Sequence, residues 1–189
     1  MKKILLIFIL LISLCGCKQT GAEYIISSMG FDNSDGLLNI CFEAIVINSE
    51  TTESQIKLLE GKGKTVKDGI KQIKKSATQK LLLSHCGVLV MGENLTQSQI
   101  DGIYEFCFDE RDITLSARVV TTKNAKQLLL QSKPVSSIAV GYDILGLIEQ
   151  YSKKDKQIKN RYFEIMSLEK QVVLPKIMPT KEGYYLENY

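Results

Sequence analysis

The 189-residue sequence contains a single histidine, no tryptophan and only five cysteines. Because His85 is the only imidazole, any acid–base mechanism that uses histidine must use this residue. The sequence also lacks an uncharged apolar run of the roughly 18 to 20 residues that a membrane-spanning helix needs. Its 24 basic and 21 acidic residues leave no large excess of either charge. These absences argue against a permanent transmembrane segment and against a nucleic-acid partner.

A shorter apolar run does stand at the N-terminus. Lys2 and Lys3 precede the uncharged residues 4–14, and the run ends in Leu14-Cys15-Gly16-Cys17. A basic start followed by a short apolar run is typical of a signal peptide. An aliphatic residue, a small residue, Gly and then Cys resemble the bacterial lipobox, in which the Cys thiol receives diacylglycerol and the chain is cut just before it. The alternative is a short buried strand that begins the protein.

The resemblance to the lipobox implies that residues 1–16 are a signal peptide and that Cys17 is the lipidated residue. Two acyl chains give stable membrane anchoring where one is marginal. We therefore expect an exported protein that is held on the outer face of the plasma membrane, with a mature domain that needs no apolar membrane face. Loss of the two leader lysines leaves 22 basic against 21 acidic residues. The remaining Cys41, Cys86 and Cys107 lack disulfide or zinc spacing, and we interpret them as small buried apolar residues.

The first half of the mature chain shows strand and helix patterns in turn. Residues 23–31 and 38–46 predict two strands, joined by a turn-rich stretch at 32–36, that pair as a hairpin. Residues 48–64 are polar and predict a loop with some helix at 53–59. Thr65 can cap a helix over 66–77 whose lysines face water, and residues 86–91 predict a central strand buried on both faces. The lysines of that helix are Lys67, Lys71, Lys74 and Lys75.

The second half continues the alternation. Asn94 and Thr96 offer caps for a helix through Cys107, and alternating residues 113–119 predict a further strand. Helices are predicted at 124–131 and 134–151, followed by a lysine-rich helix end or linker at 153–161. Residues 183–186 predict the start of a strand with nothing visible to pair with it. The expected fold class is α/β (mixed α+β), a small mixed β-sheet flanked by helices in the order β-β-α-β-α-β-α-α.

Candidate chemical sites are weak in this sequence. Gly63-Lys64-Thr65 resembles the end of a phosphate-binding loop, but Leu58 stands where that loop needs glycine. On a strand, the side chains of Ser84 and Cys86 would point away from His85, so we interpret His85 as a packed or hydrogen-bonded residue without a catalytic role. Asp109, Glu110 and Asp112 lie in a charged turn and are interpreted as solvated. We expect no catalytic residue, no metal and no cofactor.

A series of short motifs along the mature chain resembles the spore germination lipoproteins of the Ger(x)C family. The series comprises the lipobox, Glu23, Gly30-Phe31-Asp32, the stretch 63–77, Leu83-Ser84-His85 leading into Val88-Leu89-Val90-Met91-Gly92-Glu93, and the stretch 119–128 with Lys123 and Ala125. The order of these motifs carries the resemblance more than any one of them. The resemblance implies the C subunit of a nutrient germinant receptor, which works with two integral membrane subunits, A and B, and is not known as an enzyme.

The sequence departs from this family in three ways. Lys18-Gln19 stand where the family usually has Trp-Asp, Asp109 and Thr114 stand where arginines are usual, and members are about twice as long. We therefore expect an N-terminal domain over residues 17–168, with residues 169–189 as a linker and the start of a truncated second domain. The alternative function is a lipid-anchored exported enzyme or solute-binding protein with a cleft near His85. Two membrane-protein genes just upstream would favour the receptor subunit.

Overall fold

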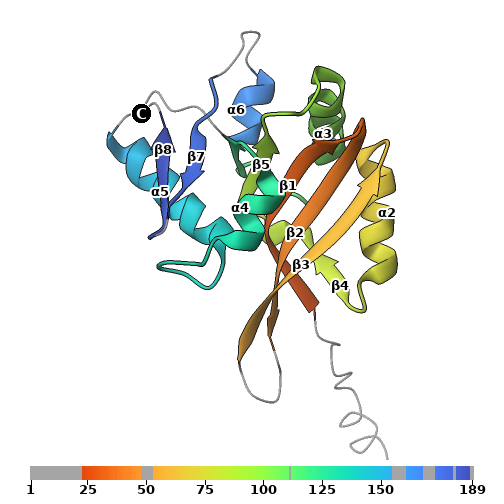
Figure 1. Cartoon of the computed structure of the whole chain (residues 1–189), viewed down its shortest axis with the longest axis horizontal. Helices are drawn as coiled ribbons and strands as arrows, with labels where there is room; N and C mark the ends of the chain where they lie inside the picture. The colour runs from red at the N-terminus through yellow and green to blue at the C-terminus, as the bar shows by residue number, and fades with distance from the viewer. Residues whose placement is uncertain are drawn as a thin grey trace, which may run out of the picture.

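The computed structural model describes residues 23–47, 53–110, 112–154, 161–167, 173–180 and 182–187. Its strands form one eight-stranded mixed sheet in the order β3-β2-β1-β5-β6-β7-β8, with β4 beside the start of β1. Helices cover both faces of this sheet (Figure 1). The fold class expected from the sequence, a mixed sheet flanked by helices, is confirmed, and the sheet is larger than predicted.

The predicted N-terminal hairpin is present. β1 (Glu23–Ser34) pairs antiparallel with β2 (Leu37–Ile47). Asp35 and Gly36 form the turn and both have positive φ, 55° and 78°. A two-residue turn of this kind matches the twist of the strands and favours the Asp-Gly sequence. The turn is thus shorter than the predicted 32–36, because Asp32 belongs to the strand.

The segment predicted as a loop with some helix is instead a strand. β3 (Ser54–Gly63) pairs antiparallel with β2 over its whole length. It is an edge strand whose first four residues are all exposed, three of them polar. Polar side chains at a sheet edge oppose pairing with other chains. The polar composition therefore reflects an edge position and not a loop, and local pattern alone could not distinguish the two.

The next helix follows the prediction closely. α2 (Val66–Ser76) is capped by Thr65, whose hydroxyl accepts the Asp68 N–H while the Asp68 carboxylate accepts the Thr65 N–H. The helix buries Val66, Ile70 and Ile73. All four of its predicted surface lysines are exposed, as expected. The chain then forms β4 (Lys80–Leu82), parallel to the start of β1, and a short 3-10 helix over Leu83–His85.

The central strand is confirmed. β5 (Val88–Gly92) is fully buried and lies between β1 and β6, parallel to both. α3 (Gln97–Asp109) begins at the predicted cap Thr96. The strand predicted over 113–119 is displaced, since β6 covers Arg118–Thr122. Ile113 and Ala117 are buried without being in a strand, so their alternation reflects burial of a turn and not pairing.

Three helices follow β6. α4 (Ala125–Gln131) agrees with the prediction and is capped by the Asn124 side chain. α5 (Val140–Lys154) begins later than the predicted residue 134, because the Asp143 carboxylate accepts the Val135 and Ser136 N–H groups and holds that segment in a turn. α6 (Tyr162–Ser167) was not predicted. Most of the predicted linker at 153–161 lies outside the described residues.

The C-terminal strand has a partner, so the prediction that nothing pairs with it is wrong. β7 (Lys176–Pro179) lies parallel to β6, and β8 (Tyr184–Glu187) pairs antiparallel with β7. Sequence patterns missed β7 because it is only four residues long and ends in proline. Both strands fall in the segment 169–189 that was assigned to a linker, and they extend the sheet of the preceding domain.

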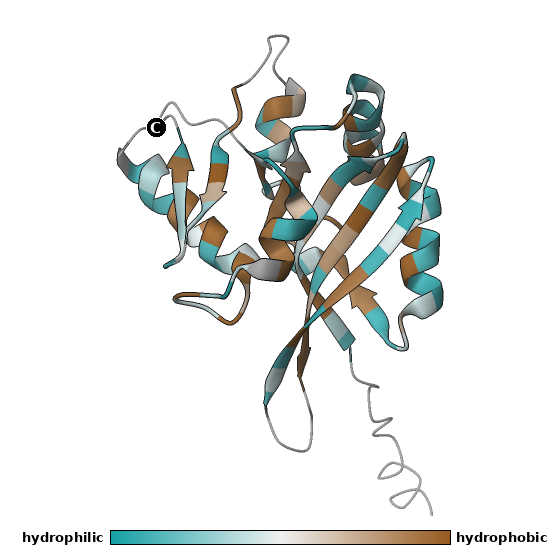
Figure 2. Cartoon of the chain, in the orientation of Figure 1, coloured by the Kyte–Doolittle hydropathy of each residue, from teal (hydrophilic) through white to brown (hydrophobic). Residues whose placement is uncertain are grey.

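The sheet separates two apolar cores. One core lies under α2, α3 and Tyr162 of α6, and the other lies under α4 and α5. In Figure 2 the central strands are largely brown, whereas α2 carries a row of teal residues on its outer side. Cys86 and Cys107 belong to the first core and Cys41 to the second. Among the described residues, no helix is long and apolar enough to cross a membrane.

Candidate functional site

A buried carboxylate fixes α5 to the middle of the sheet. Glu43 of β2 is 1% exposed, and its carboxylate accepts the backbone N–H groups of Val140 at 2.7 Å and Gly141 at 2.8 Å. The hydroxyls of Ser27 and Ser28 donate to the same carboxylate at 2.6 and 3.2 Å. A bulge in β1 between Ile26 and Ser28 accompanies this arrangement. Because a helix N-terminus favours negative charge, this buried carboxylate stabilises the docked helix.

A second buried carboxylate fixes α4. Asp32, at the carboxyl end of β1, is 2% exposed and accepts the N–H groups of Ala125 and Lys126, both at 2.8 Å. Gly92 at the end of β5 leaves the space for it, since a Cβ there would lie 2.2 Å from the Asp32 Oδ1. Gly30 has the same role under the helix, since its Cβ would lie 3.2 Å from that of Ala125. Three strand residues thus hold α4, and we call them the seat of α4: Gly30, Asp32 and Gly92.

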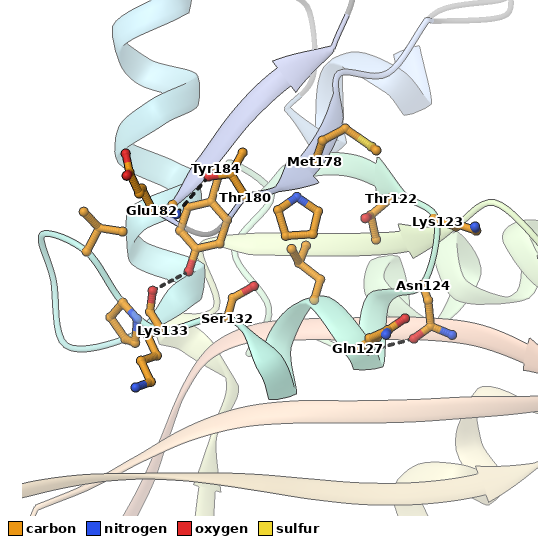
Figure 3. A pocket seen from close by; sticks show the side chains of 15 residues that line it. Thr122, Lys123, Asn124, Gln127, Ser132, Lys133, Met178, Thr180, Glu182 and Tyr184 are labelled. Atoms are coloured by element: carbon orange, nitrogen blue, oxygen red, sulfur yellow. Dashed lines mark hydrogen bonds between the residues drawn. The ribbon is translucent and has the colours of Figure 1, made fainter.

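A large cavity, which we call the main cavity, lies beside α4, at the carboxyl ends of β6 and β7. It has a volume of about 950 Å³. Its walls come from the end of β6, from α4 and the segment after it, and from the β7–β8 hairpin (Figure 3). The carboxyl edge of parallel strands is a common position for ligand sites in α/β proteins. The cavity offers cations at Lys123 and Lys133, an acid at Glu182, and apolar surface at Leu128 and Met178.

Two hydrogen-bonded side chains stabilise the outer wall of this cavity. The Tyr184 hydroxyl of β8 donates to the Lys133 carbonyl at 3.0 Å (Figure 3). Burial and the nearby Asp143 carboxylate raise the pKa of Tyr184 to about 12, so the hydroxyl stays protonated. Burial alone would raise the pKa of Asp143, but hydrogen bonds from Val135, Ser137 and Ser136 outweigh it and lower that pKa. Both groups therefore serve to hold the segment after α4.

The residues considered for catalysis do not meet in this cavity. His85 was predicted to be a packed or hydrogen-bonded residue; it is exposed in the 3-10 helix just before β5, so it is not packed. Among the described residues, no histidine or cysteine lines the main cavity. Asp109 and Asp112 are exposed as expected, and Asp109 forms an exposed ion pair with Lys67 at 3.7 Å.

The three cysteines that the structure describes, Cys41, Cys86 and Cys107, are free and buried, as the sequence predicted. Burial raises the pKa of the Cys86 and Cys107 thiols to about 12. Burial, Asp32 and Glu60 raise that of Cys41 further. A thiol that stays protonated is a poor nucleophile and a poor metal ligand. Within the described ranges, no group of His, Cys, Asp and Glu side chains could hold a metal ion. The predicted lipidation site Cys17 lies outside the described residues.

The family comparison identifies the class of protein that this fold represents. Residues 23–177 match the family described as spore germination protein N-terminal domain. Searches of the curated proteins and of the solved structures found no match. The chain belongs to this family of spore germination proteins, and the resemblance stated from its motifs is confirmed.

Several of those motifs, far apart in the sequence, come together in the structure. Gly30, Asp32, Gly92 and Ala125 come from three separate motifs and meet at the seat of α4. Glu93 of the Gly-Glu motif forms an ion pair with Lys176 of β7 at 2.9 Å. These motif residues therefore position a helix and a strand beside the main cavity.

Sequence reasoning missed Glu43 and Asp143, the carboxylates that hold α5 and the turn before it. Glu43 could have been recognised because it lies between the apolar Cys41 and Ile45 on one face of a strand, a position where a solvent-exposed acid would be unusual. No such signal exists for Asp143, because acidic residues in the first turn of a helix are ordinary.

Proposed function

We propose that this protein is a lipid-anchored, non-enzymatic subunit of a nutrient germinant receptor. The family match over residues 23–177 supports this proposal, since it connects the fold to spore germination. The subunit acts through contacts with other proteins at the membrane surface. Its partners are two integral membrane subunits of the receptor, A and B.

The membrane anchor in this proposal is diacylglycerol on Cys17. Residues 1–16 are the signal peptide, and the thiol of Cys17 is the nucleophile that accepts the lipid. Each methylene buried in the bilayer contributes about 0.8 kcal/mol, so two acyl chains hold the protein stably. The protein lies on the outer face of the plasma membrane, which in a spore is the inner spore membrane.

A structural role for the ionisable groups supports a subunit without enzymatic activity. The buried carboxylates of Glu43 and Asp32 bind backbone N–H groups of α5 and α4. The buried thiols have raised pKa values, and His85 is exposed outside the main cavity. The buried carboxylates and thiols are thus accounted for by the fold, and His85 lies apart from the main cavity. The main cavity remains suited to a ligand or a segment of a partner.

The experiment compares two cysteine variants of the full chain in a sporulating host. Cys17→Ala removes the acceptor thiol, whereas Cys15→Ala removes a thiol two residues earlier and keeps a small residue in the lipobox. We expect Cys17→Ala to remain an uncleaved precursor without lipid label and its spores to lose the nutrient response. Cys15→Ala should be cleaved, labelled and active. Normal labelling and membrane retention of Cys17→Ala would overturn the proposed anchor.

A further inference from the structure

One end of the domain is tied to the membrane by the proposed anchor. Cys17 precedes Glu23, the first residue of β1, by six positions. A chain of six residues spans at most about 22 Å. The start of β1 therefore lies within that distance of the lipid attachment point. This step rests on the lipid anchor proposed above.

Four exposed lysines gather at the start of β1. Lys80 pairs with Glu23 in the β1–β4 ladder, and the Lys57 Nζ lies 5.9 Å from the centre of the Tyr24 ring. Lys74 and Lys75 lie in the last turn of α2. Just beyond the helix, the Thr78 hydroxyl lies 3.3 Å from the Tyr24 hydroxyl. We call these four residues the basic end: Lys57, Lys74, Lys75 and Lys80. In Figure 1 the end of α2, β4 and the start of β1 lie together.

The charge of the basic end is not explained by the helix alone. Lysines in the last turn of a helix interact favourably with its dipole, which accounts for Lys74 and Lys75. Lys57 and Lys80 lie on strands, where no helix dipole acts. Among the described residues at this end, Glu23 and Glu53 are the acidic side chains beside the four lysines, so cations outnumber anions there.

Apolar side chains complete this surface on the other side of the sheet. Ile47 and Ile56 are 50% and 41% exposed. They lie where β2 ends and β3 begins, the same end of the sheet as the start of β1. Exposed lysines and exposed aliphatic side chains at one end of a domain favour contact of that end with anionic lipid headgroups.

We propose that the basic end contacts the anionic headgroups of the membrane that holds the Cys17 lipid. This contact orients the domain. Thr122, in the cavity wall, pairs with Gly92 of β5. Gly92 is level with Asp32 of β1, because the residues just before them, Met91 and Phe31, are paired. Asp32 lies nine residues along β1 from Glu23. At about 3.3 Å per residue the cavity lies roughly 30 Å from the basic end. The cavity is thus held away from the bilayer surface, where it is open to the extracytoplasmic parts of membrane partners.

The test uses the lipidated mature protein on two kinds of vesicle, phosphatidylcholine alone and phosphatidylcholine with 30% phosphatidylglycerol. Lysines are acetylated with a water-soluble reagent, and each rate is measured by mass spectrometry. The attraction of each lysine to an anionic surface corresponds to a roughly fivefold change in the binding equilibrium. We therefore expect slower acetylation, by several-fold, on the anionic vesicles at Lys57, Lys74, Lys75 and Lys80. High salt should remove the difference, because it screens exposed charges. Lys64, Lys67 and Lys123 serve as internal controls at the opposite end of the strands and should react equally on both.

Two variants remove the same amount of charge at opposite ends. In Lys74→Gln/Lys75→Gln/Lys80→Gln, Lys57 should react at the same rate on both vesicles, whereas in Lys64→Gln/Lys67→Gln/Lys123→Gln it should stay protected on anionic vesicles. Equal rates for all lysines of the wild-type protein on both vesicles would overturn the proposal, as would equal loss of protection in both variants. Flotation with the vesicles tests the anchor separately. A protein that floats without protection contradicts only the orientation, whereas one that does not float contradicts the anchor.

Discussion

The seat of α4 allows a sharp test of how the motif residues act together. Replacing Asp32 by Ala leaves the buried N–H of Ala125 and the partly buried N–H of Lys126 without an acceptor. Each unsatisfied buried donor costs about 1 to 3 kcal/mol, so the free energy of unfolding should fall by about 2 to 6 kcal/mol. Replacing Gly92 by Ala places a Cβ 2.2 Å from the Asp32 Oδ1. Overpacking of this kind costs about 1 to 3 kcal/mol.

The two losses should not add, because one carboxylate causes both. In the Asp32→Ala background the closest contact of the new Cβ is gone, and the remaining contacts are to Asn94 Oδ1 and the Phe31 carbonyl, both at 3.0 Å. We therefore expect Gly92→Ala to cost at least about 1 kcal/mol less in that background, a coupling within the range for neighbouring residues. Urea unfolding followed by circular dichroism measures all four proteins of the cycle.

Gly102→Ala provides the matched control. Gly102 lies inside α3, and a Cβ there would have nothing within 4 Å. Alanine is favoured over glycine in a helix by about 0.5 to 1 kcal/mol, so this substitution should stabilise the protein in both backgrounds. If the losses from Gly92→Ala and Asp32→Ala were additive, the reasoning that connects the Gly-Glu motif to α4 would be refuted.

Three further predictions concern single residues. Glu43→Gln should lower the free energy of unfolding by about 2 to 4 kcal/mol, because an amide cannot accept from all four of its donors; the same change at the exposed Glu105 should have almost no effect, and equal melting curves would contradict the role of Glu43. The lowered pKa of Asp143 means that its stabilisation is complete above the ordinary carboxyl pKa of about 3.9 and is lost as the pH falls through the lower folded value. The melting temperatures of the wild type and Asp143→Asn should therefore differ at pH 7 and converge on acidification, and a constant difference would refute this. His85→Gln should change stability by less than about 0.5 kcal/mol, as is usual for exposed side chains, and should keep the nutrient response, whose loss in a normally folded variant would overturn the non-catalytic interpretation.

The parts of the fold that local patterns predict are those that local chemistry determines. The Asp35-Gly36 turn, the Thr65 and Thr96 caps and the apolar run of β5 depend on neighbouring residues alone, and all were predicted within a few residues. β3 and the β7–β8 hairpin depend on partners far away in the chain. Their short or polar sequences are compatible with several structures until the rest of the sheet is present.

At the candidate site too, sequence patterns identify residues but not the contacts between distant parts of the chain, as the seat of α4 shows. The motif series identified Gly30, Asp32, Gly92 and Ala125, because their order along the chain resembles a family. Sequence alone could not show that they converge, since Asp32 and Ala125 are 93 positions apart. Glu43, which has an equivalent role under α5, was not identified, because one buried acid in a strand has no local partner that would indicate its function.

The most direct test of a receptor subunit is its composition in the spore membrane. The tagged full chain is expressed from its own locus, and the complex is purified from spore membranes in mild detergent and analysed by quantitative mass spectrometry. Our account predicts that two integral membrane proteins encoded beside this gene copurify in amounts close to that of the lipidated chain. Recovery of the lipidated chain without either membrane protein would contradict the account.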